Sequence, residues 1–265
     1  MRLLAVIGNI TRDVVDGSAP RLGGAPFYAA RALRALGTPA VIVTKGMARE
    51  LVAFGLPVVS RPSRSITAFT IVNQDGGRDM IVEELGERWT PEDARGWVAD
   101  AMRRVGWVHV APLLRSDFPA ETVAELASGG RRLSLDGQGL VRVRRVGPLE
   151  LDAEFDPELL RHVSVLKLAH EEARVLLGEI GEPSLKSLGV PEIVVTRGAE
   201  GSMVWAAGQL TDVPARPVPG VGDPTGAGDA FGAAYLASRS AGHHPVAAAR
   251  RANAFVGGLL SGRLS

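Results

Sequence analysis

Short apolar runs recur along this chain, and stretches with helical spacing separate most of them. Leu3–Ile7 is an uninterrupted apolar run that stops at Gly8-Asn9, which is typical of a strand buried on both faces of a sheet. Val41–Thr44 and Glu192–Thr196 have the same character, whereas the apolar residues of 27–36 keep helical spacing. Strands that alternate with helices predict an α/β fold whose mostly parallel sheet is covered by helices on both faces.

The same pattern predicts further elements along the chain. Strands are expected at 107–110, 132–135, 163–167 and 202–205, and helices at 48–54, 91–105, 119–127 and 171–177.

Composition limits the class of protein. With 265 residues, the chain is long enough for one large domain, here expected to span 1–265. A net charge of +1 argues against nucleic acid or a membrane surface as partner. The absence of cysteine excludes disulfides and thiolate chemistry. No apolar stretch has the length of a signal peptide or a membrane span, so a cytoplasmic enzyme is expected.

A loop rich in proline and glycine leads into an alanine-rich helix between Pro217 and Leu236. Gly226-Ala227-Gly228 lies where the helix begins, and there the first backbone N–H groups lack carbonyl partners and the helix dipole is positive. An anion can approach this backbone closely. Asp229 follows directly and places a carboxylate beside the anion site. This arrangement suits the deprotonation of a hydroxyl group that attacks a phosphoryl group.

Other interpretations of the glycines are possible. A tight turn that caps a helix, with Asp229 as a partner of the dipole, is the purely structural alternative. A Walker loop is excluded because no lysine follows these glycines. A dinucleotide-binding turn fits poorly because a proline-rich loop, not an apolar strand, precedes it.

The segment Asp223–Phe231 (D-P-T-G-A-G-D-A-F) resembles the carboxy-terminal motif of the ribokinase (PfkB) carbohydrate kinase family. The resemblance implies a ribokinase-like three-layer αβα sandwich with a mostly parallel central sheet and a small β lid. It also implies that the backbone of Gly226, Ala227 and Gly228 forms an anion hole and that Asp229 is the catalytic base. Asp223 would help to bind a monovalent cation such as K⁺.

The amino-terminal part is similar to the family's first motif, which has an early Asp followed by paired glycines. By this resemblance Asp13, Gly23 and Gly24 bind substrate hydroxyls, and a carboxylate suits two charge-assisted hydrogen bonds from a polyol. The chain between them is short, so a reduced lid is expected from about 12–22 and 64–85. The start of this motif is similar to small-lid members such as myo-inositol kinase-like proteins.

Two further segments resemble family motifs. Lys167–Ala173 is similar to the Asn-x-x-Glu segment, in which Glu172 would hold Mg²⁺ through water, but Ala169 replaces the Asn. The segment 196–201 is similar to a Thr-x-Gly-x-x-Gly segment that contacts a nucleotide. The cofactor-binding residues implied in this way are Lys167, Thr196, Gly198, Gly201 and Asn253.

Two further residues are weaker candidates. Asp136 ends a predicted strand, and Arg78 follows a predicted turn at 73–77. An Asp at the end of a strand and an Arg after a turn are both common, so neither position by itself indicates a functional site. The five histidines lack the spacing of a metal site.

Together the motifs predict an ATP- and Mg²⁺-dependent kinase that phosphorylates a hydroxyl of a sugar, cyclitol or nucleoside. The alternative is a catalytically weak or inactive ligand-binding or regulatory protein on the same fold, which the loss of the Asn at Ala169 would favour. An oxidoreductase is disfavoured because no dinucleotide turn follows the first strand. The sequence leaves both a monomer and a homodimer open.

Overall fold

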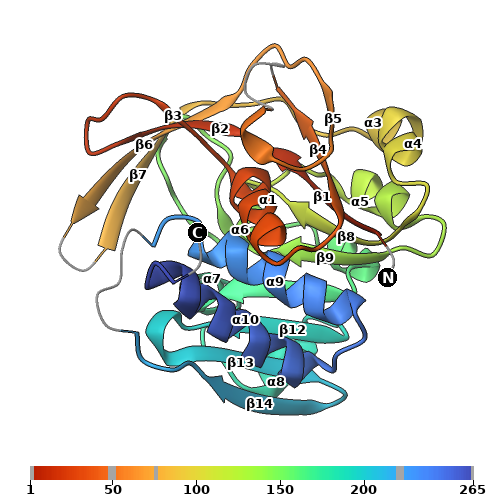
Figure 1. The fold of residues 1–265 in the computed structure, drawn as a ribbon, viewed down its shortest axis with the longest axis vertical. Coiled ribbons are helices and arrows are strands. Elements are labelled where there is room, and N and C mark those ends of the chain that lie inside the picture. The colour runs from red at the N-terminus through yellow and green to blue at the C-terminus, as the bar shows by residue number, and fades with distance from the viewer. Residues whose placement is uncertain (1–2, 47–51, 75–76, 219–223, 264–265) are drawn as a thin grey trace.

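A nine-stranded sheet forms the centre of the molecule (Figure 1). The structure is a computed structural model that describes residues 3–46, 52–74, 77–218 and 224–263. The strand order is β14-β13-β12-β11-β9-β8-β1-β4-β5, and the pairs from β12 to β5 are parallel. Two antiparallel strands, β13 and β14, complete one edge.

The strands of this sheet are β1 (Leu3–Asn9), β4 (Ala40–Lys45), β5 (Val58–Arg61), β8 (Val105–Ala111), β9 (Arg132–Asp136), β11 (Val165–Ala169), β12 (Glu192–Thr196), β13 (Gly201–Ala206) and β14 (Gln209–Pro214).

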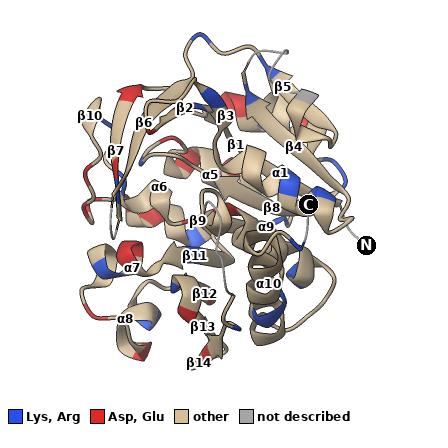
Figure 2. Ribbon diagram, turned by 60° about the vertical axis from the view of Figure 1, so that its left-hand side comes forward, with Lys and Arg blue, Asp and Glu red and all other residues tan. Residues whose placement is uncertain are grey.

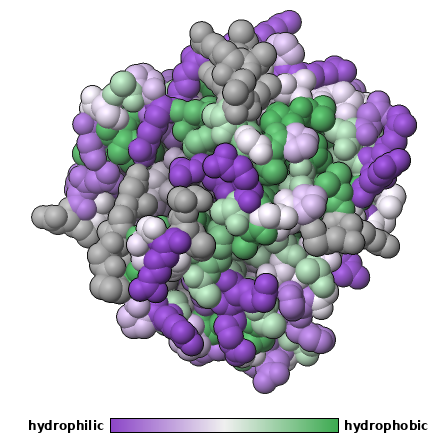
Figure 3. Space-filling model, viewed as in Figure 1, coloured by the Kyte–Doolittle hydropathy of each residue, from purple (hydrophilic) through white to green (hydrophobic). Residues whose placement is uncertain are grey.

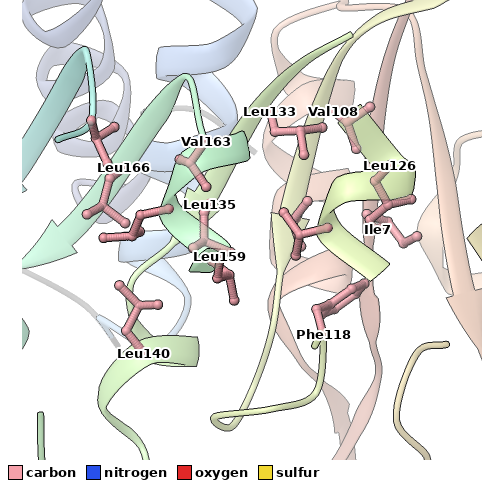
Figure 4. Packing of buried hydrophobic residues seen from close by; sticks show 14 of the residues in the cluster. Ile7, Val108, Phe118, Leu126, Leu133, Leu135, Leu140, Leu159, Val163 and Leu166 are labelled. Atoms are coloured by element: carbon pink, nitrogen blue, oxygen red, sulfur yellow. The ribbon is translucent and has the colours of Figure 1, made fainter. Parts of the chain in front are cut away.

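Helices cover both faces of the sheet, because each central strand is apolar on both sides. In β1, Leu4 and Val6 join one hydrophobic cluster, and Ala5 and Ile7 join the other. The first cluster packs against α1 (Ala25–Ala35), α9 (Ala227–Ser240) and α10 (Pro245–Leu260). The second cluster contains Ile7, Val108 and Leu133 from three neighbouring strands (Figure 4). The layers are therefore helix, sheet and helix, as the α/β prediction required.

The remaining helical elements are short. They are α3 (Pro91–Asp93), a π-helical segment (Ala94–Val98), α4 (Ala99–Ala101), α5 (Ala120–Ala127), α6 (Gln138–Val141), α7 (His170–Leu177), α8 (Glu182–Ser187) and 3-10 turns at Val52–Phe54, Pro157–His162 and Gly198–Glu200.

A second sheet of five strands starts where β1 ends (Figure 1). Its order is β10-β7-β6-β2-β3, with β2 (Thr11–Val15), β3 (Arg21–Gly23), β6 (Thr67–Gln74), β7 (Gly77–Glu84) and β10 (Gly147–Pro148). Phe69, Ile71 and Val82 of this sheet pack against Leu113 and Leu114, which follow β8. This apolar contact holds the small sheet over the carboxyl ends of the large-sheet strands. The segments 12–22 and 64–85 supply four of its strands, and β10 is an addition that the sequence patterns did not indicate.

The predicted helices differ most from the structure at three places. The helix expected at 27–36 starts at Ala25. The helix expected over 91–105 ends at Ala101, and Val105 already belongs to β8; it is also distorted at Gly96, whose φ/ψ are not helical. Of the helix expected at 48–54, only the turn Val52–Phe54 lies within the described residues.

Charge and hydropathy are mixed on the surface. Basic and acidic residues are distributed over both sheets (Figure 2), and hydrophilic side chains interrupt the hydrophobic areas in the view of Figure 3. Among the described helices, none combines the length and the apolar character needed to cross a membrane.

Candidate active site

The first turn of α9 places the backbone of Gly226, Ala227 and Gly228 next to the carboxylate of Asp229. Gly226 precedes this helix with φ 78°, in the left-handed region that favours glycine. A Cβ at this position would also overlap the ring of Tyr28 from α1. Both the backbone conformation and the lack of space therefore require glycine here. The N–H of Ala227 donates to the Pro224 carbonyl (3.0 Å), whereas the described residues offer no hydrogen-bond acceptor to the N–H groups of Gly226 and Gly228. Ala227 can therefore contribute to the predicted anion hole only if its turn bond opens.

A small cavity lies between this turn and the second sheet. Its volume is about 70 Å³. The lining residues are Thr11, Asp13, Gly24, Ala25, Tyr28, Phe69, Ile71, Arg78, Met80, Leu113, Gln138, Arg142, Thr225, Gly226 and Asp229. The cavity thus joins Asp13 and Gly24 from the amino-terminal motif to Gly226 and Asp229 from the carboxy-terminal motif.

Asp13 is buried at the floor of the cavity, with 5% of its surface exposed. Burial raises the pKa of its carboxyl group, although the Thr11 hydroxyl and nearby arginines oppose that rise. Oδ1 of Asp13 has no hydrogen-bond partner among the described residues. A Cβ on Gly23 would overlap the Asp13 carboxylate and lie 2.7 Å from the Thr11 hydroxyl. Gly23 therefore provides the space in which the carboxylate lies, while Gly24 lines the cavity.

The carboxylate of Asp229 is partly buried in the cavity wall. Burial raises its pKa to about 7, and Asp136 adds to the rise. Lys167 and Arg142 lower this pKa, and Glu172 raises it. These charges come from four elements around Asp229, so its protonation depends on their balance. A carboxyl group that ionises near neutral pH is suited to general base catalysis.

Lys167 lies in β11, behind the first turn of α9. Its Nζ is 3.1 Å from Asp136 Oδ2, and both side chains are buried. The same Nζ would be 3.2 Å from a Cβ on Gly228. Burial lowers the pKa of Lys167. The negative charges of Asp136, Glu172 and Asp229 raise it by more than burial lowers it, so the ammonium stays charged. Lys167 thus supplies a fixed positive charge beside the anion site. Asp136, a weak candidate in the sequence, proves to be the residue that holds it.

Glu172 is buried in the first turn of α7, which lies beside α6 and β11 (Figure 2). Its Oε2 accepts a hydrogen bond from the Ala169 N–H (2.7 Å), which leaves Oε1 without such a bond in the described residues. Burial raises the pKa of Glu172, whereas Lys167 lowers it. The described part of the chain contains no cluster of three or more His, Asp or Glu side chains that could hold a metal ion. A single carboxylate fits a Mg²⁺ ion that keeps most of its water ligands.

A second, larger cavity of about 270 Å³ lies on the other side of the α9 turn. It is lined by Thr196, Gly198, Ala199, Gly201, Ala215, Arg216, Val218, Pro224, Ala227, Gly228, Phe231, Asn253, Val256, Gly257 and Leu260. Four predicted cofactor-binding residues are in this set. The fifth, Lys167, is not, because it lies behind Gly228 and bonds to Asp136.

Asn253 has a partly structural role in this cavity. Its Nδ2 donates to the Val213 carbonyl (2.9 Å) and to the Ser202 hydroxyl (3.2 Å). The amide nitrogen therefore fixes α10 to β13 and β14. Only Oδ1 is left for a ligand.

The structure also adds residues that the sequence did not indicate. Arg142 and Gln138 enter the small cavity from α6 and its end. Arg78, a weak candidate in the sequence, also lines this cavity from β7. Arg142 follows Asp136 by six positions, and no spacing rule singles it out. Asp223 lies outside the described residues, so the cation site expected there stays a prediction.

The two cavities lie on either side of the first turn of α9, and Asp229 lines the small one. The α/β fold with a small covering sheet is the ribokinase-like fold. Comparisons with known proteins agree. A solved structure described as a pyrophosphate-dependent kinase in the ribokinase family, complexed with a pyrophosphate analogue and myo-inositol, matches with a TM-score of 0.82 at 25% identity; the match covers 97% of this chain and 94% of that one. A nucleoside kinase from Burkholderia thailandensis shares the fold, with a TM-score of 0.76 at 21% identity over 97% of this chain and 91% of that one.

Sequence relatives are kinases as well. Cytidine kinase of Thermococcus kodakarensis is 26% identical over 90% of this chain and 89% of its own length. Ribokinase of Bacillus subtilis is 26% identical over 72% of this chain and 60% of its own length. The profile of the pfkB family carbohydrate kinases matches residues 57–259. The chain belongs to the PfkB family of carbohydrate kinases, and it is a phosphotransferase with a hydroxyl group as acceptor.

Proposed function

We propose that the protein transfers the γ-phosphate of ATP to a hydroxyl of a sugar, cyclitol or nucleoside, with Asp229 as general base. The observation that carries this proposal is the position of Asp229 and Gly226 on the small cavity, with Gly228 on the large one. The acceptor would lie in the small cavity and the donor in the large cavity. The transferred group would then pass over the first turn of α9.

In this mechanism Asp229 accepts the proton of the attacking hydroxyl while Asp13 holds neighbouring hydroxyls. The N–H groups of Gly226 and Gly228 donate to the oxygens of the migrating phosphoryl group, and the Lys167 ammonium stabilises the same negative charge. Glu172 would hold Mg²⁺ through the water ligands of the ion, which would neutralise part of the phosphate charge when bound with ATP.

ATP as donor is supported by the large cavity. Phe231, Val256 and Leu260 line its apolar part, and Thr196, Arg216 and Asn253 add polar groups to the lining. An apolar cavity next to a phosphate site suits a nucleobase. Pyrophosphate, the donor named for a similar structure, would leave that cavity unused.

The direct test is a donor and acceptor screen. The protein is incubated with Mg²⁺ and either ATP or pyrophosphate, against sugars, cyclitols and nucleosides, and phosphorylated products are detected by mass spectrometry. We expect product with ATP, and none after chelation of Mg²⁺. Product with pyrophosphate but not with ATP would refute ATP as the donor. The absence of product with every alcohol would favour a binding or regulatory protein.

The Asp136–Lys167 pair provides a prediction about pH dependence. Lys167→Met removes a positive charge that lowers the pKa of Asp229, so the acid limb of kcat/KM should move up by about one pH unit. Asp136→Asn removes a negative charge that raises this pKa, so the limb should move down by about the same amount. The measurement is kcat/KM for the acceptor from pH 5 to 9. Shifts in the same direction for both variants would contradict the assignment.

A further inference from the structure

Arg142 brings a guanidinium group to the small cavity from the end of α6. Its backbone is fixed on both sides. The Arg142 N–H donates to the Gln138 carbonyl (3.0 Å), and the Arg142 carbonyl accepts from the Arg115 N–H (2.8 Å). An antiparallel bridge joins the same residue to Leu151. The half-buried side chain therefore starts from a well-defined point beside the cavity.

The guanidinium of Arg142 has no hydrogen bond or ion pair with any part of the chain that the structure describes. Its nitrogen atoms are not among the buried polar atoms, so a molecule in the cavity can reach them. Three other arginines near this segment each have a carboxylate partner, namely Arg115 with Asp152, Arg144 with Asp117 and Arg145 with Glu150. Arg142 alone of these four keeps its five N–H donors for solvent or a ligand.

Three carboxylates lie within the electrostatic range of Arg142. Its positive charge lowers the pKa of Asp13, of Asp229 and of Glu172. None of the three forms an ion pair with it in the described part of the chain. The carboxylates therefore attract the guanidinium toward the site without using its donors.

Arg142 and Lys167 differ in what they offer to a phosphoryl group. Lys167 Nζ donates to both carboxylate oxygens of Asp136 (3.1 and 3.3 Å), so it acts mainly as a fixed charge behind the α9 turn. Arg142 lines the same cavity as Gly226 and Asp229. A planar guanidinium can donate two parallel hydrogen bonds to a pair of phosphoryl oxygens. Of the two cations, Arg142 is the one with donors available to the migrating group.

We propose that Arg142 is a catalytic residue, which donates hydrogen bonds to the phosphoryl oxygens during transfer. This inference rests on the proposed kinase function and adds a group to the same site. The acceptor oxygen forms a bond to the γ-phosphorus, and its proton passes to Asp229. The bond between the γ-phosphorus and the bridging oxygen breaks, and ADP leaves with the electron pair. The guanidinium stabilises the negative charge on the nonbridging oxygens in this step.

Replacement of Arg142 by glutamine should lower kcat by at least ~10³-fold, the range found for arginines that contact a migrating phosphoryl group. The rate is measured with ATP, Mg²⁺ and the best acceptor, and KM for that acceptor should change much less than kcat. Arg142→Lys keeps the charge but not the planar fork, so its kcat should lie between those of Arg142→Gln and the wild type. It also serves as the test if circular dichroism shows that Arg142→Gln does not fold.

Arg145→Gln is the matched control. Arg145 belongs to the same segment, has an exposed side chain paired with Glu150, and does not line the small cavity. This variant should keep the wild-type kcat. An equal loss of kcat in Arg145→Gln and Arg142→Gln would show that the segment is needed only for structure, and would overturn the proposal.

The pH profile separates catalysis from a mere balance of charge. Arg142 lowers the pKa of Asp229, so Arg142→Gln should raise this pKa further and move the acid limb of kcat to higher pH. A loss of kcat that persists on the alkaline side of the shifted limb supports contact with the phosphoryl group. Recovery of the wild-type kcat there, or a loss confined to KM for the acceptor, would overturn the proposal and leave the kinase function intact. No phosphorylation of any alcohol by the wild-type protein would overturn both.

Discussion

Replacement of Asp229 by asparagine is expected to lower kcat by about 10²–10⁴-fold, because the variant keeps the shape of the site but cannot accept a proton. The measurement is the rate of ATP-dependent phosphorylation of the best acceptor. The affinity for ATP, measured by calorimetry, should change little because Asp229 does not line the cavity proposed for the donor. Turnover near the wild-type value in a folded variant would exclude Asp229 as the base.

The same substitution should stabilise the protein in a pH-dependent way. Folding raises the pKa of Asp229 from 3.8 to about 7, so the folded state favours the protonated form. The ionised carboxylate therefore lowers the free energy of unfolding, an effect that is absent below pH 3.8, grows as pH rises, and is complete above about pH 7. Asp229→Asn removes this cost. We expect its Tm to exceed that of the wild type by several degrees at pH 8, and to match it at pH 3.5 if both remain folded.

Replacement of Gly226 by alanine is expected to reduce kcat/KM by at least ~10²-fold. A non-glycine residue at φ 78° costs roughly 1–2 kcal/mol, and the new Cβ would also overlap the Tyr28 ring. The first turn of α9 must then shift, and the Gly226 and Gly228 N–H groups lose their alignment with the phosphoryl oxygens. Removal of one such donor is worth about 10²–10³-fold in other enzymes.

Gly242→Ala is the control that separates backbone strain at a positive φ from the overlap with the Tyr28 ring. Gly242 has φ 92° and no heavy atom within 4 Å of a Cβ, so it carries the backbone cost without the overlap. Both variants should lose stability, as measured by thermal unfolding. Only Gly226→Ala should lose activity. Equal activity in the two variants would show that the geometry of the α9 turn is not needed for transfer.

The sequence alone identified the large sheet, the helical layers and the motifs at both ends of the chain. These features follow from local chemistry: continuous apolar runs must be buried on both faces, and glycines before an alanine-rich helix expose backbone N–H groups. The β lid at 64–85 was recognisable because β-rich runs interrupt the alternation of strands and helices. The prediction of a helix up to Val105 was wrong, since the helix ends at Ala101 and Val105 is the first residue of β8.

Only the tertiary structure could decide which distant residues share a cavity. Asp136 and Lys167 meet because β9 and β11 are neighbours in the sheet, although they lie apart in the sequence. Arg142 and Met80 both line the small cavity because a short helix and the second sheet close over the same strand ends. A motif contains only a few adjacent residues. The size of a cavity and the charge around it depend on residues from many separate helices and strands. The sequence therefore indicated the type of reaction, whereas the fold was needed to show which residues share each cavity.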